Sequence, residues 1–205
     1  MRRSQTVIKI FSVLALSAIA TQVFAFDPND VQLGSPEHAG TGCPMGTVAA
    51  VLSPDAKELS ILFDNYVAEA GGSTGRTIDR KNCTFAVPVH IPQGYSVSVI
   101  SVDYRGFYSL PAGAQAKFSS QLFFAGDAET PLTRTFTGPS DNEYLLSTGL
   151  FNGNVVWSRC GDDVIMRGNT SMFVRNSNPS IEALATVDSA DISAGLLFQL
   201  QWRHC

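Results

Sequence analysis

Apolar and polar residues alternate with a period of two along much of this chain. Leu59, Ile61 and Phe63 share one face of an extended segment, and Ser60 and Asp64 lie on the other. Two later segments repeat the alternation, with apolar residues at Cys83, Phe85, Val87, Val89 and Ile91, and at Leu196, Phe198, Leu200 and Trp202. Because successive side chains of a strand point to opposite faces, each segment predicts a strand with one buried and one wet face.

The alternation changes phase once, within residues 95–104. Val97 and Val99 begin the pattern, and Ile100, Val102 and Tyr104 continue it one position out of step. One extra residue in a strand re-aims every later side chain, so the switch predicts a β-bulge near Ile100.

Turn signals separate the predicted strands. Clusters of Gly, Pro, Asn, Asp and Ser stand at residues 53–55, 71–75, 92–94, 111–113, 138–142 and 152–153. No apolar stripe with helical spacing is sustained, and residues 180–186 could form one short helical turn at most. Roughly eight to ten strands with wet outer faces predict an all-β fold, a two-sheet antiparallel β-sandwich of Greek-key or jelly-roll type, with a closed β-barrel as the alternative.

The first 25 residues have the pattern of a secretory signal peptide. A basic start precedes an uncharged, largely apolar run at residues 10–20, and Ala25 supplies the small residue before a cleavage site. The apolar run is much shorter than the ~20 residues of a membrane span, which argues against an anchor. We therefore expect cleavage between Ala25 and Phe26 and a secreted or periplasmic protein, with no membrane span after the signal is removed.

The mature part reads as one domain. Residues 26–42 are rich in Pro, Gly and Asp and predict an irregular lead-in, and residues 43–205 predict a single β-sandwich domain. The whole chain has 205 residues, of which 44% are hydrophobic, and this composition excludes a disordered or fibrous protein. Its formal net charge of −4 argues against a nucleic-acid partner.

All four cysteines lie after the predicted signal peptide, at Cys43, Cys83, Cys160 and Cys205. An even number in an exported chain predicts two disulfides. A zinc site is a weaker interpretation, because no two cysteines have the close spacing of metal ligands. Pairing Cys43 with Cys83 and Cys160 with Cys205 keeps each loop local and is the favoured connectivity, although the sequence leaves the other two open.

Several short motifs occur in an order that resembles a known family. They are GTGCP (40–44), LSPD (52–55), LFDNY (62–66), RKNC (80–83), PQGY (92–95) and VDYRG (102–106). This order resembles a secreted family of bacteria and fungi described as domain of unknown function 4360. The resemblance implies export and a pair of disulfides, and it brings no activity, cofactor or catalytic residue.

Side chains suited to catalysis are sparse, and none is assigned a catalytic role. The three histidines, His38, His90 and His204, are expected at the solvated surface, and no G-x-S-x-G elbow accompanies them. Asp162 and Asp163 form the most conspicuous carboxylate pair. Adjacent residues of a strand face opposite ways, so a turn or strand-edge role is preferred to a glycosidase pair or a Ca²⁺ loop.

Three further segments receive structural interpretations. The Gly-rich residues 70–77 lack the lysine of a phosphate loop and predict a hairpin loop. Asn82 and Asn169 begin formal N-glycosylation sequons, which matter only in a eukaryotic secretory pathway. Residues 130–154 suggest no role. We expect no metal site and no cofactor.

One ligand surface stands out, at Tyr104, Arg105, Phe107 and Tyr108. The bulge near Ile100 would re-aim these side chains, and Arg105 would offer planar donors beside aromatic rings. Rings with such donors suit a sugar face or an acidic partner, whereas core tyrosines are the competing interpretation.

The sequence therefore favours a non-catalytic binding or envelope-associated module. Its partner would be a glycan or a secreted or envelope protein. The alternatives are a secreted hydrolase acting on glycans and a proteinase inhibitor, whose reactive loop would lie at residues 71–76 or 139–143.

Overall fold

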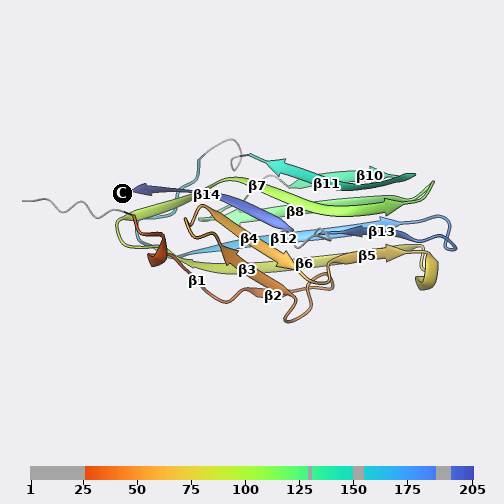
Figure 1. Cartoon of the computed structure of the whole chain (residues 1–205), viewed down its shortest axis with the longest axis horizontal. Coiled ribbons are helices and arrows are strands. Elements are labelled where there is room, and N and C mark those ends of the chain that lie inside the picture. Colours follow the sequence, from red (N-terminus) through yellow and green to blue (C-terminus); the bar gives the residue numbers. More distant parts are fainter. Residues whose placement is uncertain (1–25, 129–130, 150–154, 188–194) are drawn as a thin grey trace, which may run out of the picture.

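Two antiparallel seven-stranded sheets pack face to face in the computed structural model (Figure 1). The structure describes residues 26–128, 131–149, 155–187 and 195–205. The predicted signal peptide, residues 1–25, lies outside the described residues. Neither sheet closes on itself within the described chain, so the β-sandwich is confirmed and the barrel alternative is wrong.

The first sheet has the order β1-β6-β12-β8-β10, with β2 beside β6 and β9 beside β8. Its strands are β1 (Gln32–Leu33), β2 (Glu37–Ala39), β6 (Ile78–His90), β8 (Gln115–Phe124), β9 (Asp127–Ala128), β10 (Leu132–Thr137) and β12 (Val164–Arg175). The predicted lead-in, residues 26–42, thus contributes two short edge strands, preceded by the 3-10 turn η1 (Pro28–Asp30).

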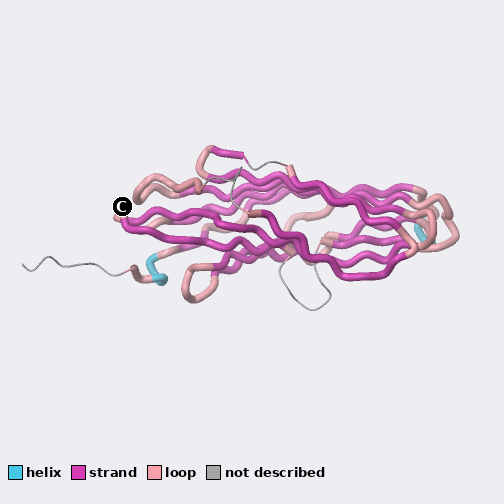
Figure 2. The backbone as a smooth tube through the Cα atoms, turned by 90° about the horizontal axis from the view of Figure 1, so that it is seen from above, coloured by secondary structure: helices cyan, strands magenta, loops and turns pink. Residues whose placement is uncertain are grey.

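The second sheet has the order β3-β4-β14-β7-β13-β5, with β11 on the other side of β7. Its strands are β3 (Val48–Leu52), β4 (Glu58–Phe63), β5 (Val67–Ala70), β7 (Tyr95–Leu110), β11 (Ser140–Thr148), β13 (Ala183–Thr186) and β14 (Leu196–His204). A second 3-10 turn, η2 (Gly72–Thr74), follows β5. The strands of both sheets run lengthwise, so that many of the turns collect at the two ends of the sandwich (Figure 2).

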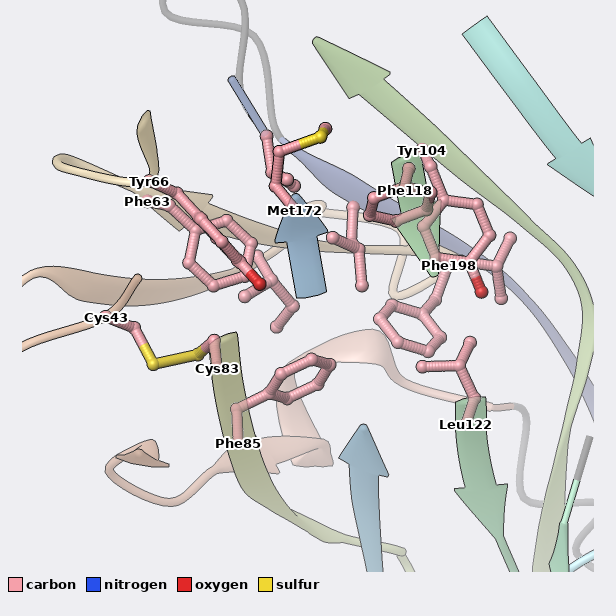
Figure 3. Close-up of a cluster of buried hydrophobic side chains, with 14 of the residues drawn as sticks. Cys43, Phe63, Tyr66, Cys83, Phe85, Tyr104, Phe118, Leu122, Met172 and Phe198 are labelled. Atoms are coloured by element: carbon pink, nitrogen blue, oxygen red, sulfur yellow. A yellow bond between two sulfur atoms is a disulfide. The ribbon is translucent and has the colours of Figure 1, made fainter. Parts of the chain in front are cut away.

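The predicted alternation builds the core between the sheets. Leu59, Ile61 and Phe63 are buried from β4, and Phe85, Val87 and Val89 are buried from β6. Figure 3 shows side chains of both sheets meeting: Phe85, Phe118 and Leu122 come from the first sheet, and Tyr104 and Phe198 come from the second. The interior also holds one polar pair, because the Tyr66 hydroxyl lies 3.0 Å from Thr170 Oγ1. Burial raises the pKa of Tyr66, which keeps this hydroxyl protonated.

Two disulfides hold the sandwich, with the favoured connectivity. Cys43 and Cys83 are bonded and fully buried, and they fix the segment before β3 to the middle of β6. Cys160 and Cys205 are bonded at an exposed end of the sandwich, and they fix the end of β14 to the segment before β12.

The predicted bulge lies at Ile100. Ser101 pairs with Gln199, and Val99 pairs with Leu200, so Ile100 is the extra residue of β7. Val97, Val99 and Val102 are buried, but Ile100 is 36% exposed. The phase change is therefore confirmed, but Ile100 does not belong to the inward set in which the sequence pattern placed it.

The sequence allows a short helical turn at residues 180–186, and this prediction is wrong. Ala183–Thr186 form the strand β13, which pairs with β5 on one side and with β7 on the other. Ala183 and Ala185 are fully buried. Pairing with two neighbouring strands outweighs the good helix propensity of alanine here.

Candidate functional site

The described chain begins and ends at the same end of the sandwich (Figure 1), and four aromatic rings gather there. The Phe26 ring stacks on Trp202 at a centroid distance of 5.0 Å and meets the edge of Tyr95 at 5.1 Å. The Tyr95 ring in turn lies 5.2 Å from the His204 ring. Phe26, Tyr95 and Trp202 are all half-buried, so each ring keeps an accessible part.

Strand register brings these rings together. Tyr95 is the first residue of β7 and pairs with His204 at the end of β14, and Val97 pairs with Trp202. The turn before β7 contains Gly94 at a φ of +85°, a conformation that favours glycine. The indole Nε1–H of Trp202 donates to the Ala56 carbonyl at 2.7 Å, which fixes the orientation of its ring.

Residues 157–161, which include Cys160 of the second disulfide, pack against this end of the sandwich. The Gly161 N–H donates to the Tyr95 carbonyl at 2.8 Å, and the Ser158 N–H donates to the Val97 carbonyl at 2.9 Å. The Arg203 guanidinium lies 4.2 Å above the Trp157 ring. Both tryptophans of the chain therefore stand at this end, which makes their fluorescence a local probe.

A hollow of about 610 Å³ opens beside the rings, and we call it the end hollow. It is lined by Phe26, Pro28, Asp55, Lys57, Tyr95, Ile100, Leu200, Gln201, Trp202, Arg203 and His204. An apolar and aromatic wall with a few polar groups is the usual composition of a small-molecule site.

Asp55 is the carboxylate among the described lining residues. The Ser53 hydroxyl donates to Asp55 Oδ1 at 2.6 Å, and the Lys57 N–H donates to the same oxygen at 3.2 Å. These hydrogen bonds, the one from Ser53 first, lower the pKa of Asp55 below its ordinary value. The group is therefore ionised near neutral pH, and it presents Oδ2 as an acceptor beside Lys57 Nζ at 3.9 Å.

The ligand surface predicted around Tyr104 is not assembled as the sequence suggested. Tyr104 is fully buried and packs against Phe118 at 5.3 Å, so it belongs to the core and presents nothing to a ligand. Tyr108 is half-buried and stacks on Phe136 at 4.5 Å. Both tyrosines occupy inward positions of β7, because the bulge at Ile100 restores the inward alternation at Val102.

Arg105 and Phe107 lie on the opposite, outer face of β7 and are half-buried. They pair with Leu145 and Glu143 of β11. Gly106 between them is closely approached, because a Cβ there would lie 2.5 Å from the Tyr144 hydroxyl. That hydroxyl donates to the Thr186 carbonyl at 2.7 Å. The predicted four residues are thus divided between the core and the outer face.

The other predicted candidates are dispersed. His38 Nδ1 lies 3.1 Å from the Cys43 carbonyl, and His90 Nδ1 lies 2.8 Å from Asp163 Oδ1 at an exposed position. Asp162 is also exposed, in the turn before β12. Across the described residues, no group of three or more His, Cys, Asp or Glu side chains is arranged to hold a metal ion.

The end hollow escaped the sequence analysis because its parts are far apart in the chain. The sequence pattern places Phe26 in an irregular lead-in, Trp202 in a strand and His204 at the terminus. The feature of the sequence that could have indicated this site is Cys205, because its disulfide with Cys160 fixes the end of the last strand beside the segment before β12. Nothing in the sequence placed Phe26 there.

Comparisons with known proteins agree with the predicted family. Residues 29–205 match the family described as "Domain of unknown function (DUF4360)". An "Uncharacterized secreted protein" of Arthroderma benhamiae is 33% identical over 180 residues, which cover 87% of this chain and 74% of that protein. Among solved structures, TmCBM61 in complex with β-1,4-galactotriose is 9% identical, with a TM-score of 0.31, over 83% of this chain and 88% of that one. This structural similarity is slight.

The secreted relative and the two disulfides support the predicted location, secreted or periplasmic. A search of the described residues for a helix long and apolar enough to cross a membrane finds none.

Proposed function

This chain belongs to the DUF4360 family, and we propose that it is a non-catalytic binding module that holds carbohydrate in the end hollow. The observation that carries the proposal is the aromatic wall of Phe26, Tyr95 and Trp202 beside polar side chains. The apolar face of a sugar ring packs on aromatic rings, while its hydroxyls need hydrogen-bonding partners.

The polar lining supplies those partners. Asp55 accepts hydrogen bonds from sugar hydroxyls, and Lys57, Gln201 and Arg203 donate to them. Hydrogen bonds to charged groups are the stronger ones, so Asp55 and Arg203 would select the orientation of the bound ring.

The electrostatics of Asp55 favour binding over hydrolysis at this site. A glycosidase needs a general acid whose pKa is raised, so that it carries a proton near neutral pH. The Ser53 and Lys57 hydrogen bonds shift the pKa of Asp55 in the opposite direction. Asp55 is therefore suited to accept hydrogen bonds from a sugar and not to protonate a leaving group.

Replacing Phe26 by Ala is expected to weaken oligosaccharide binding about tenfold, because one stacking ring is lost. Asp55→Asn keeps the shape of the side chain, removes its charge, and should weaken binding severalfold. The measurement is titration calorimetry of the mature protein with uncharged β-1,4-glucan, β-1,4-galactan, α-1,4-glucan and β-mannan oligosaccharides, with tryptophan fluorescence as a second readout.

Ile181→Ala is the matched control, because Ile181 is 50% exposed in the turn before β13 and away from the end hollow. The proposal is contradicted if no oligosaccharide binds, or if the control weakens binding as much as Phe26→Ala. Release of shorter products during the titration would instead support the glycan hydrolase, and inhibition of a protease panel would support the inhibitor.

A further inference from the structure

The outer face of the first sheet carries several cationic side chains among polar and apolar ones. Its central strand β12 presents Ile165, Arg167, Asn169, Ser171, Phe173 and Arg175 outward, because the intervening residues are buried. Directly opposite positions of β6 and β8 add Arg80, Asn82, Thr84, Lys117, Ser119 and Gln121. Among the outward positions of the described strands of this sheet, the carboxylate is Glu37, on the edge strand β2 opposite Ala86. An acidic protein thus carries a basic face.

Three of the cations surround one ring, and we call this group the cationic cluster: Arg80, Lys117, Phe173 and Arg175. Phe173 pairs with Arg80 on one side and with Lys117 on the other. Neighbouring strands are ~4.8 Å apart, so the two cations flank the ring at a Cα separation of about 10 Å. The Arg80 guanidinium lies 5.8 Å from the Phe173 centroid, and Arg175 follows two residues later on the same face.

The cluster has no carboxylate of its own. Arg80, Lys117 and Arg175 are exposed, and within the described residues no acidic side chain lies at ion-pair distance from them. By contrast, the nearby cations Arg76 and Lys81 each form an ion pair with the buried Asp79, at 3.5 and 3.7 Å. The charges of the cluster are therefore available to a partner.

A hollow of about 400 Å³ adjoins the cluster at the end of the sheet. It is lined by Thr77, Ile78, Phe173, Arg175, Asn176 and Ser177. The half-buried Phe173 ring thus forms a wall of this hollow while Arg175 stands at the same place with its charge exposed.

We propose that the cationic cluster binds an anionic polysaccharide, one that carries carboxylates or sulfates. The guanidiniums of Arg80 and Arg175 offer planar pairs of donors that match such groups, and the Lys117 ammonium adds a third charge. Asn82, Ser119 and Ser171 continue along the face as hydrogen-bonding partners for hydroxyls, and Phe173 offers an apolar platform. A long, hydroxyl-rich polyanion satisfies all of these groups together, and it is a polymer that an exported protein meets.

This site is independent of the end hollow. Arg80 precedes His90 by ten residues in β6, which corresponds to about 33 Å of extended strand. His90 lies at the end of the sandwich that leads through the turn into Tyr95 and the end hollow. Failure of one proposal therefore leaves the other intact, because their variants and probes differ.

The test compares binding of the mature protein to dextran sulfate, polygalacturonate and uncharged dextran by affinity electrophoresis at low and at physiological salt. We expect the two charged polymers to retard the protein, dextran to have no effect, and salt to weaken the retardation. Each exposed charge contributes up to about fivefold in affinity, so Arg80→Gln/Arg175→Gln should weaken binding by about tenfold, with an upper bound of about 25-fold.

Arg134→Gln/Arg159→Gln removes the same charge from two exposed arginines that lie off this face. Arg134 pairs with the inward-facing Phe118, and Arg159 lies at the opposite end of the sandwich. Equal weakening in both double variants, or no retardation by either charged polymer, overturns the proposal. Single-stranded DNA that competes as well as the polysaccharides at equal charge also overturns it, because the face would then recognise charge alone. Preference for polygalacturonate or for dextran sulfate identifies the anionic group.

Discussion

Replacing Cys160 and Cys205 together by serine is expected to lower the free energy of unfolding by about 4 kcal/mol. The bridge spans 45 residues, and the chain-entropy estimate for a loop of that length is about 4 kcal/mol. Both cysteines are exposed, so the serine hydroxyls reach water and no buried polar group is created. The expected decrease in the free energy of unfolding therefore measures the contribution of the crosslink alone. Urea denaturation under non-reducing conditions measures it.

The same variant tests how the end hollow is held. The bridge ties the end of β14, where Trp202 and His204 stand, to the segment that hydrogen-bonds Tyr95 through Gly161. Without the bridge, tryptophan fluorescence should shift towards that of exposed indole at urea concentrations below the global transition. Reduction of the wild-type protein by dithiothreitol is the control and should give the same early change. An unchanged midpoint and a single coincident transition would show that the bridge does not support this end.

The sequence predicts the sandwich because the longer strands each show the alternation of apolar and polar residues that is typical of a half-buried strand. In β6, Phe85, Val87 and Val89 are buried and alternate with more exposed residues, and a one-residue slip would expose all of them. The phase switch in β7 was informative for the same reason, because Val99 and Val102 need an extra residue between them to reach one core. By contrast, β13 is four residues long and alanine-rich, and only its pairing with β5 and β7 makes it a strand.

The candidate sites depend on neighbours that the sequence does not reveal. The end hollow needs the register that sets Tyr95 beside His204, together with the position of Phe26. The cationic cluster needs β6, β12 and β8 to lie side by side, because Arg80, Phe173 and Lys117 come from three separate strands. Long-range pairing places these residues, and local patterns in a single sequence contain no record of it.

Replacing Tyr104 by Ala is expected to destabilise the fold by about 3–5 kcal/mol, as for other large aromatic truncations in a core. Tyr104 has no exposed surface, and its ring packs against Phe118 between the sheets. Phe107→Ala is the control, since Phe107 is half-buried on the outer face of the same strand and should cost clearly less. Thermal and urea unfolding of the two variants measure the difference. The sequence pattern around Tyr104 allows either a core tyrosine or a ligand surface, and in a ligand surface Tyr104→Ala would melt normally and lose binding. A melting temperature within one or two degrees of the wild type would therefore restore that interpretation, whereas the burial of Tyr104 predicts a drop of at least several degrees.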